Sequence, residues 1–236
     1  MTTATVQQGQ NFDNIQYGTQ QNPSVMEADI RFNNSCIYNH QSRSQHDWNK
    51  LIGFFDGYSP VSRSVRWGWR WSVDNGSIEV APYVHHNDQI LLPSADQWVL
   101  SVPLNEWIKI KIRLERCNNR YVFRYEHNGN VIEKTVSVSN LNGTYAGICL
   151  TDLLYFGGTK PAPHQITIDY QNIKTTSCQK VRLYGASQTW SVTYKDLDGN
   201  PAASDGGPSD DFSICAEAGS LAISFGDVHW QIMGNW

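Results

Sequence analysis

The sequence carries little charge and no long apolar run. Only 17% of its 236 residues are Asp, Glu, Lys or Arg, and the formal net charge is −4. Nucleic-acid-binding domains gather an excess of Lys and Arg on one face, so we expect no nucleic acid as a partner. No stretch approaches the roughly 20 apolar residues of a membrane-spanning helix, and we expect no membrane contact.

The N-terminus and the cysteines also lack familiar signals. The first ten residues have neither the basic nor the apolar region of a secretory signal peptide, so we expect synthesis in a cytosol. The five cysteines include no CxxC pair, which argues against structural zinc. We expect buried or partly buried free thiols, as in a reducing cytosol. A single disulfide bridge between Cys178 and Cys215 is the alternative.

Helical periodicity is missing as well, whereas period-two alternation recurs along the chain. Glu106–Leu114 is the clearest case, because its isoleucines fall on one face and Lys109, Lys111 and Arg113 on the other. Short alternating runs separated by turn residues indicate an all-β sandwich or jelly roll.

The stretch 64–84 is rich in tryptophan and predicts a β-hairpin. Trp67, Trp69 and Trp71 share one face of the first strand, and Asn75-Gly76 favours a two-residue type I′ turn. That turn places Glu79 opposite Ser72 and diagonal to Arg70, within reach of an ion pair. A second Asn-Gly pair at 128–129 places Arg124 across from Glu133.

The tryptophan face has two interpretations. Three large rings at period two are typical of a core packed against a second sheet. They could also form an exposed platform for sugar rings, although exposed aromatic patches of that size are uncommon. We favour the core, which leaves the face with Arg66, Arg70 and Glu79 open.

Changes in composition divide the chain into three parts. Residues 1–24 are rich in Gln, Asn, Thr and Gly, and indicate an extended arm that is ordered only where it docks. Residues 25–174 carry most of the expected strands and predict a jelly-roll sandwich. Residues 175–236 predict a small C-terminal β-sandwich with a Gly/Pro/Asp-rich loop.

Residues 24–172 resemble the concanavalin A-like lectin/glucanase jelly roll. The resemblance lies in Asn49–Phe54, Trp67–Arg70, Trp107–Leu114 and, above all, Tyr155-Phe156-Gly157-Gly158 followed by Ala162-Pro163-His164. It implies a sandwich of concanavalin A type and a fold that commonly binds carbohydrate.

A second resemblance covers the C-terminal part. The stretch 193–200, with 212–216 and 218–220, is similar to C-terminal modules of virion proteins in phages of Bacteroidetes bacteria. It implies a non-enzymatic virion structural protein, either a capsid decoration or head fibre or a tail component that touches host surface glycans. Other virion proteins and further copies of the chain are then the expected partners, with the arm as a candidate anchor.

The main alternative is a carbohydrate-active enzyme or free lectin of the same fold. Glucanases of this fold need three carboxylates alternating on one strand. Here Glu27-Ala28-Asp29 begins such a pattern, but Arg31 and Phe32 follow and the third carboxylate is missing. We therefore predict no catalytic residues and no cofactor.

The open face of the hairpin is the predicted binding surface for a glycan or a protein partner. Planar aromatic rings beside hydrogen-bonding side chains suit either ligand. The predicted residues are Trp48, Tyr58, Arg66, Arg70, Glu79, Tyr83 and His85.

One loop resembles a calcium site in its spacing. Asp196, Asp198 and Asn200 place oxygen ligands at alternate positions, but the bidentate glutamate that usually follows is absent. Because Asp-Gly is itself a turn signal, a turn is the preferred interpretation.

Overall fold

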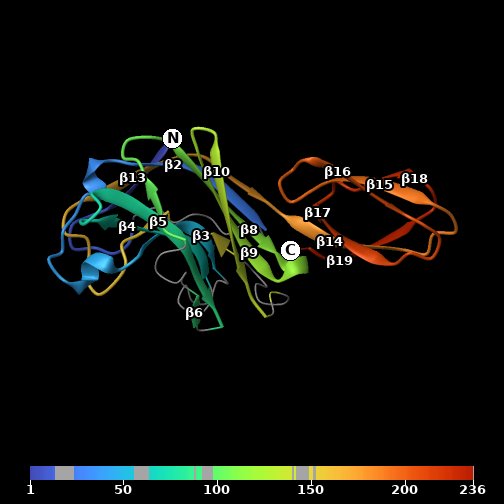
Figure 1. Ribbon diagram of the computed structural model, residues 1–236, viewed down its shortest axis with the longest axis horizontal. Helices are drawn as coiled ribbons and strands as arrows, with labels where there is room; N and C mark the ends of the chain where they lie inside the picture. Colours follow the sequence, from blue (N-terminus) through green and yellow to red (C-terminus); the bar gives the residue numbers. More distant parts are fainter. Residues whose placement is uncertain are drawn as a thin grey trace.

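The computed structural model describes residues 1–13, 24–55, 64–87, 89–91, 98–139, 141, 149–150 and 153–235. Within these ranges the chain consists of antiparallel strands and three short 3-10 helices, so the all-β prediction is confirmed. Two sheets form a large sandwich, and two three-stranded sheets form a smaller lobe beside it (Figure 1).

Sheet A has six strands in the order β1-β13-β2-β8-β9-β10. The strand order places β8, which contains most of the alternating run at residues 106–114, near the centre of the sheet. The strands are β1 (Thr2–Val6), β13 (Ile166–Thr176), β2 (Val25–Phe32), β8 (Ile108–Glu115), β9 (Arg120–His127) and β10 (Asn130–Ser137).

Sheet B has seven strands and contains the tryptophan hairpin at its centre. The main order is β11-β3-β4-β5-β6, while β12 also pairs with β3 and β7 with β5. The strands are β3 (Asn49–Phe55), β4 (Ser64–Ser72), β5 (Ser77–His86), β6 (Gln89–Leu91), β7 (Leu100–Val102), β11 (Cys149–Leu150) and β12 (Leu154–Tyr155).

The tryptophan face is core. Trp67 and Trp69 have no exposed surface, and Trp71 at the end of β4 is half-buried against the same core. Trp67 meets Phe123 of sheet A edge to face, with ring centroids 5.3 Å apart, and its indole N–H donates to the Lys111 carbonyl. These contacts join the two sheets, as large rings at period two predict.

The first hairpin turn differs from the prediction. Ser72 pairs with Ser77, so four residues connect the strands instead of two. The change of two residues preserves which face each side chain occupies, because the side-chain period is two. Arg70 therefore lies directly opposite Glu79. The second hairpin has the predicted two-residue turn, with His127 opposite Asn130 and Arg124 opposite Glu133.

The N-terminal arm docks on the chain's own sheet. Thr2–Val6 forms β1, which pairs with β13, and Ala4 and Val6 are buried in the core. These residues are therefore an edge strand of sheet A. Residues 14–23 of the predicted arm lie outside the described residues.

The smaller lobe has its own apolar cluster, built around Val181, Leu183, Trp190 and Val192. One sheet has the order β17-β14-β19 and the other β16-β15-β18. The strands are β14 (Cys178–Tyr184), β15 (Trp190–Lys195), β16 (Pro201–Gly206), β17 (Phe212–Glu217), β18 (Ala222–Phe225) and β19 (His229–Asn235).

The prediction of free thiols is confirmed for Cys36 and Cys178 and is wrong for Cys215. Cys36 and Cys178 are free and buried, and burial raises the pKa of both thiols, to about 12 and about 11. Cys215 is disulfide-bonded. Because Cys178 is free, the alternative of a Cys178–Cys215 bridge is wrong.

The three 3-10 helices have three or four residues each, and no helix in the described ranges is long and apolar enough to cross a membrane.

Candidate functional site

The predicted binding face is only partly open. Arg66, Glu79, Tyr83 and His85 lie on the face of sheet B opposite the core, as alternation requires, yet all four are buried. Neighbouring side chains contribute to the cover, for example Lys50 over the Tyr83 ring and Arg70 against Glu79. The expectation of an open face is therefore wrong for these four residues. Tyr58 lies outside the described residues.

Arg70 and Glu79 form the centre of this face. Arg70 Nε donates to Glu79 Oε2 at 2.7 Å, and its guanidinium lies 4.4 Å from the centroid of the Trp48 ring. Burial alone would raise the pKa of Glu79, but hydrogen bonds from Arg70 and Asn75 hold that pKa below its usual value of 4.5. The pair is therefore ionised and fixed in orientation.

A groove of about 520 Å³ opens beside this pair. We call it the hairpin groove, because it runs over the turn between β4 and β5. Its lining residues carry hydroxyl, amide and charged groups, and they include the half-buried Trp71. The lining residues are Asn39, Gln45, His46, Arg70, Trp71, Ser72, Val73, Asp74, Asn75, Glu79, Val99 and Ser101.

A second group on the same face centres on Lys50, which sequence reasoning missed. Its ammonium lies 4.5 Å from the Tyr83 ring centroid and 5.1 Å from that of Tyr155. Burial, and then the nearby Arg66 charge, lower the pKa of Lys50 from 10.5 to about 8. A lysine between the buried residues of β3 was the available signal, since alternation places it on the face opposite Leu51.

The Tyr155–Gly158 motif closes this end of the face. A Cβ at Gly157 would lie 2.6 Å from Lys50 Nζ, and one at Gly158 would lie 2.2 Å from Asp47 Oδ2. Gly158 also has φ +101, which L side chains rarely adopt. The glycines therefore allow the turn to approach Asp47 and Lys50 closely.

The lowered pKa of Lys50 predicts that stability rises with pH. Between pH 7 and pH 9 the folded chain releases the Lys50 proton while the unfolded chain keeps it, so the free energy of unfolding should increase by about 1 kcal/mol. Denaturant unfolding at these pH values measures the increase. Lys50→Met should remove that part of the pH dependence, and an unchanged slope in the variant would contradict the assignment.

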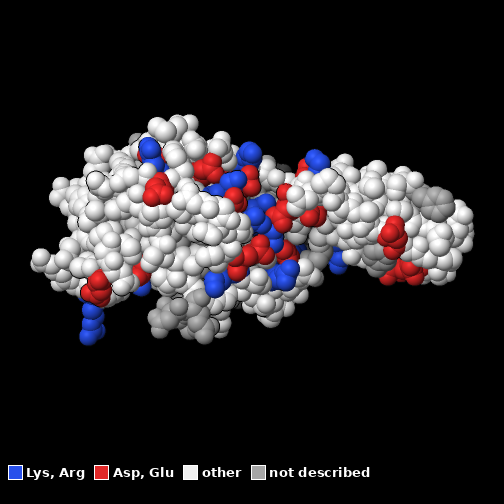
Figure 2. Space-filling model, turned by 45° about the horizontal axis from the view of Figure 1, so that its top comes forward, with Lys and Arg blue, Asp and Glu red and all other residues white. Residues whose placement is uncertain are grey.

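A separate charged cluster lies where the two lobes meet. Charged side chains gather in a band between them (Figure 2), and β8 contributes Lys111 and Arg113. Lys111 Nζ lies 2.8 Å from Asp198 Oδ1, and Arg113 Nη1 lies 2.5 Å from Asp198 Oδ2. These two residues were predicted to face outward, and they do, but Asp198 of the smaller lobe covers them.

The loop 196–200 is therefore a docking turn between the lobes, and the turn itself is what the preferred interpretation of its Asp-Gly pair predicted. Asp196 Oδ1 accepts the backbone N–H groups of Asp198 and Asn200, which shapes the turn. The Asp198 carboxylate is turned toward two cations. Among the described residues, no three His, Cys, Asp or Glu side chains are grouped as a metal site.

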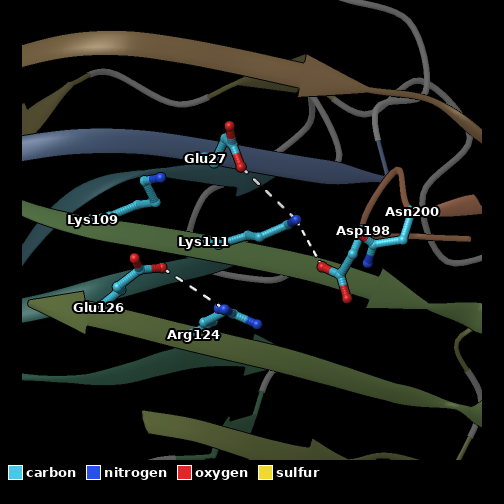
Figure 3. A pocket seen from close by; sticks show the side chains of 7 residues that line it. All are labelled: Glu27, Lys109, Lys111, Arg124, Glu126, Asp198 and Asn200. Atoms are coloured by element: carbon cyan, nitrogen blue, oxygen red, sulfur yellow. Dashed lines mark hydrogen bonds and ion pairs between the residues drawn. The ribbon is translucent and has the colours of Figure 1, made fainter. Parts of the chain in front are cut away.

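A small cavity of about 190 Å³ lies at this junction (Figure 3). Three acidic and three basic side chains line it together with Asn200. They are Glu27, Glu126, Asp198, Lys109, Lys111 and Arg124.

The fold brings Glu126 and Asp198 to the same cavity as Glu27, but Asp198 does not have the property of a glycosidase acid. A glycosidase requires one carboxyl whose raised pKa keeps it protonated. Burial alone would raise the pKa of Asp198, but Lys111 and Arg113 hold it below its usual value of 3.8. Glu27 lies 3.8 Å from Lys111 and 3.7 Å from Lys174. These pairings suit a structural contact better than acid catalysis.

Comparisons with known proteins give no family. No protein-family model and no curated protein matches the chain. Among solved structures, the chain is similar to the crystal structure of alginate lyase vAL-1 from Chlorella virus. The two are 12% identical, the match covers 73% of this chain and 83% of that one, and the TM-score is 0.40.

Proposed function

We propose that the hairpin groove binds a glycan and that the chain is a non-catalytic carbohydrate-binding protein. One observation carries this proposal. A groove of about 520 Å³ is lined by the fixed Arg70–Glu79 pair and, around the end of β4, by the half-buried Trp71, which alternation places on the core face of that strand. Sugar rings stack on aromatic faces through their C–H groups, while their hydroxyls need donors and acceptors that do not move.

The remaining lining supports the same ligand class. Asn75, Ser101 and Ser72 supply neutral hydrogen-bonding groups, and Asn75 Nδ2 already bonds to Glu79 at 2.8 Å. Trp48 lies against the far side of Arg70, which holds the guanidinium in place. Few apolar side chains line the groove, so a hydroxyl-rich ligand suits it better than a lipid or an apolar peptide.

Glycan screening of the full chain, followed by calorimetry on the best ligand, tests the proposal. Ser101→Tyr places a ring in the groove and should weaken binding at least about tenfold, because the ligand and the ring compete for one space. Thr193→Tyr adds the same ring on an exposed strand position of the smaller lobe and should leave affinity unchanged. Equal binding by both variants would refute the groove as the site.

The biological setting proposed with this activity is a phage particle. The resemblances of the sequence support a concanavalin A-type sandwich on a virion, in a capsid decoration, head fibre or tail component, where glycan binding would serve attachment to a host surface. A free lectin or a carbohydrate-active enzyme of the same fold is the alternative. Mass spectrometry of purified particles for this chain, together with an assay for glycan cleavage, distinguishes these settings.

A further inference from the structure

The smaller lobe exposes an unusual amount of apolar surface on two consecutive strands. Of the ten large apolar side chains that are strongly exposed in the described chain, four lie between residues 223 and 233. They are Ile223, Trp230, Ile232 and Met233, each 43–49% exposed. Scattered apolar residues need no explanation, but a group of this kind marks an interaction surface.

The register shows that three of these side chains, Ile223, Trp230 and Ile232, belong to the inner faces of the lobe. Trp230 pairs with Leu183 and Ile232 with Val181, and both partners are fully buried. On the other sheet, Ile223 pairs with the buried Val192. Core-facing residues of β18 and of β19, each an edge strand of its own sheet, therefore still meet water.

The two open edges also lack protection against pairing. Edge strands are usually guarded by charged residues or proline. The opposite edges of the lobe follow that rule, because β16 carries Pro201 and Asp205 and β17 ends at Glu217. By contrast β18 and β19 contain no Asp, Glu, Lys, Arg or Pro.

We propose that β19 is the interface of a symmetric dimer, in which it pairs antiparallel with β19 of a second copy of this chain. An antiparallel pairing centred near Gln231 would set Trp230 of each copy opposite Ile232 of the other, so the strand is complementary to itself. It brings no like charges together. A two-fold pair also closes on itself, whereas pairing of β18 with β19 of another copy would continue as a fibre.

Sedimentation equilibrium of the full chain over a range of concentrations tests this interface. The wild-type chain should be dimeric, and Gln231→Lys should raise the dissociation constant at least about tenfold, because two lysines would face each other near the axis. Ala203→Lys adds the same charge to the exposed edge strand β16 and should leave the dimer unchanged.

Two further measurements keep the test decisive. Near-ultraviolet circular dichroism shows whether each variant is folded. If Gln231→Lys does not fold, hydrogen exchange on the wild-type chain replaces it, and the β19 amides should become protected as concentration rises. A wild-type chain that stays monomeric, or a dimer that Gln231→Lys leaves intact, would overturn the proposal.

Discussion

Trp67→Ala is expected to lower the free energy of unfolding by about 3–5 kcal/mol, the range for large aromatic side chains deleted from a core. Trp67 is fully buried, meets Phe123 of the opposite sheet and donates to the Lys111 carbonyl. The substitution therefore leaves a cavity between the sheets and removes the indole hydrogen bond to that carbonyl. Denaturant unfolding, followed by circular dichroism, measures the loss.

Trp71→Ala is the matched control, because Trp71 lies on the same strand and the same face but is only half-buried. Its loss should be smaller, about 1–2 kcal/mol, in proportion to the apolar area removed from water. Equal losses for the two variants would mean that the tryptophans do not contribute through burial between the sheets.

Arg113→Met is expected to destabilise the chain by about 1–3 kcal/mol, because it removes a buried guanidinium from a network in which Asp198 keeps Lys111 and Glu115 keeps Arg120 as a cationic partner. The Arg113 side chain is 8% exposed and contacts three acidic residues, Asp198 at 2.5 Å, Glu115 at 3.2 Å and Glu133 at 3.3 Å. Since Asp198 belongs to the smaller lobe, loss of the Arg113–Asp198 ion pair should also weaken the contact between the two lobes. Limited proteolysis between the lobes should become faster while the large sandwich stays folded.

Arg182→Met provides the control for Arg113. Arg182 pairs with Asp211 at 2.5 Å, but both side chains are largely exposed, so water and salt replace the interaction. We expect an unchanged unfolding midpoint and an unchanged cleavage rate. Proteolysis of Arg113→Met at the wild-type rate would show that Asp198 does not hold the lobes together.

Alternation in the sequence was enough to place side chains on faces. It predicted the strands of the tryptophan hairpin, the buried isoleucines of β8 and the Arg124–Glu133 register, because a period of two is a local property of extended backbone. It also gave the correct partners for the Arg70–Glu79 pair, although the turn proved two residues longer than Asn75-Gly76 suggested. Turn lengths that differ by two give the same faces, so the pattern could not distinguish them.

The candidate site was predictable only in part, for the same reason. Arg70, Glu79 and Trp48 were identified because they lie on or beside the hairpin, whereas Lys50 comes from a neighbouring strand and meets Tyr83 only in the folded sheet. Likewise, residues 223–233 look like ordinary strands until the register reveals that their inner faces are uncovered.

The sequence by itself determined the strand class and the face on which each residue lies. Only the tertiary structure decided what covers each face: Asp198 over Lys111 and Arg113, Lys50 over Tyr83, and nothing within the described part of this chain over much of Trp230. The physical reason is that alternation follows from neighbouring backbone dihedrals, while cover depends on segments distant in sequence that meet only when the sheets close.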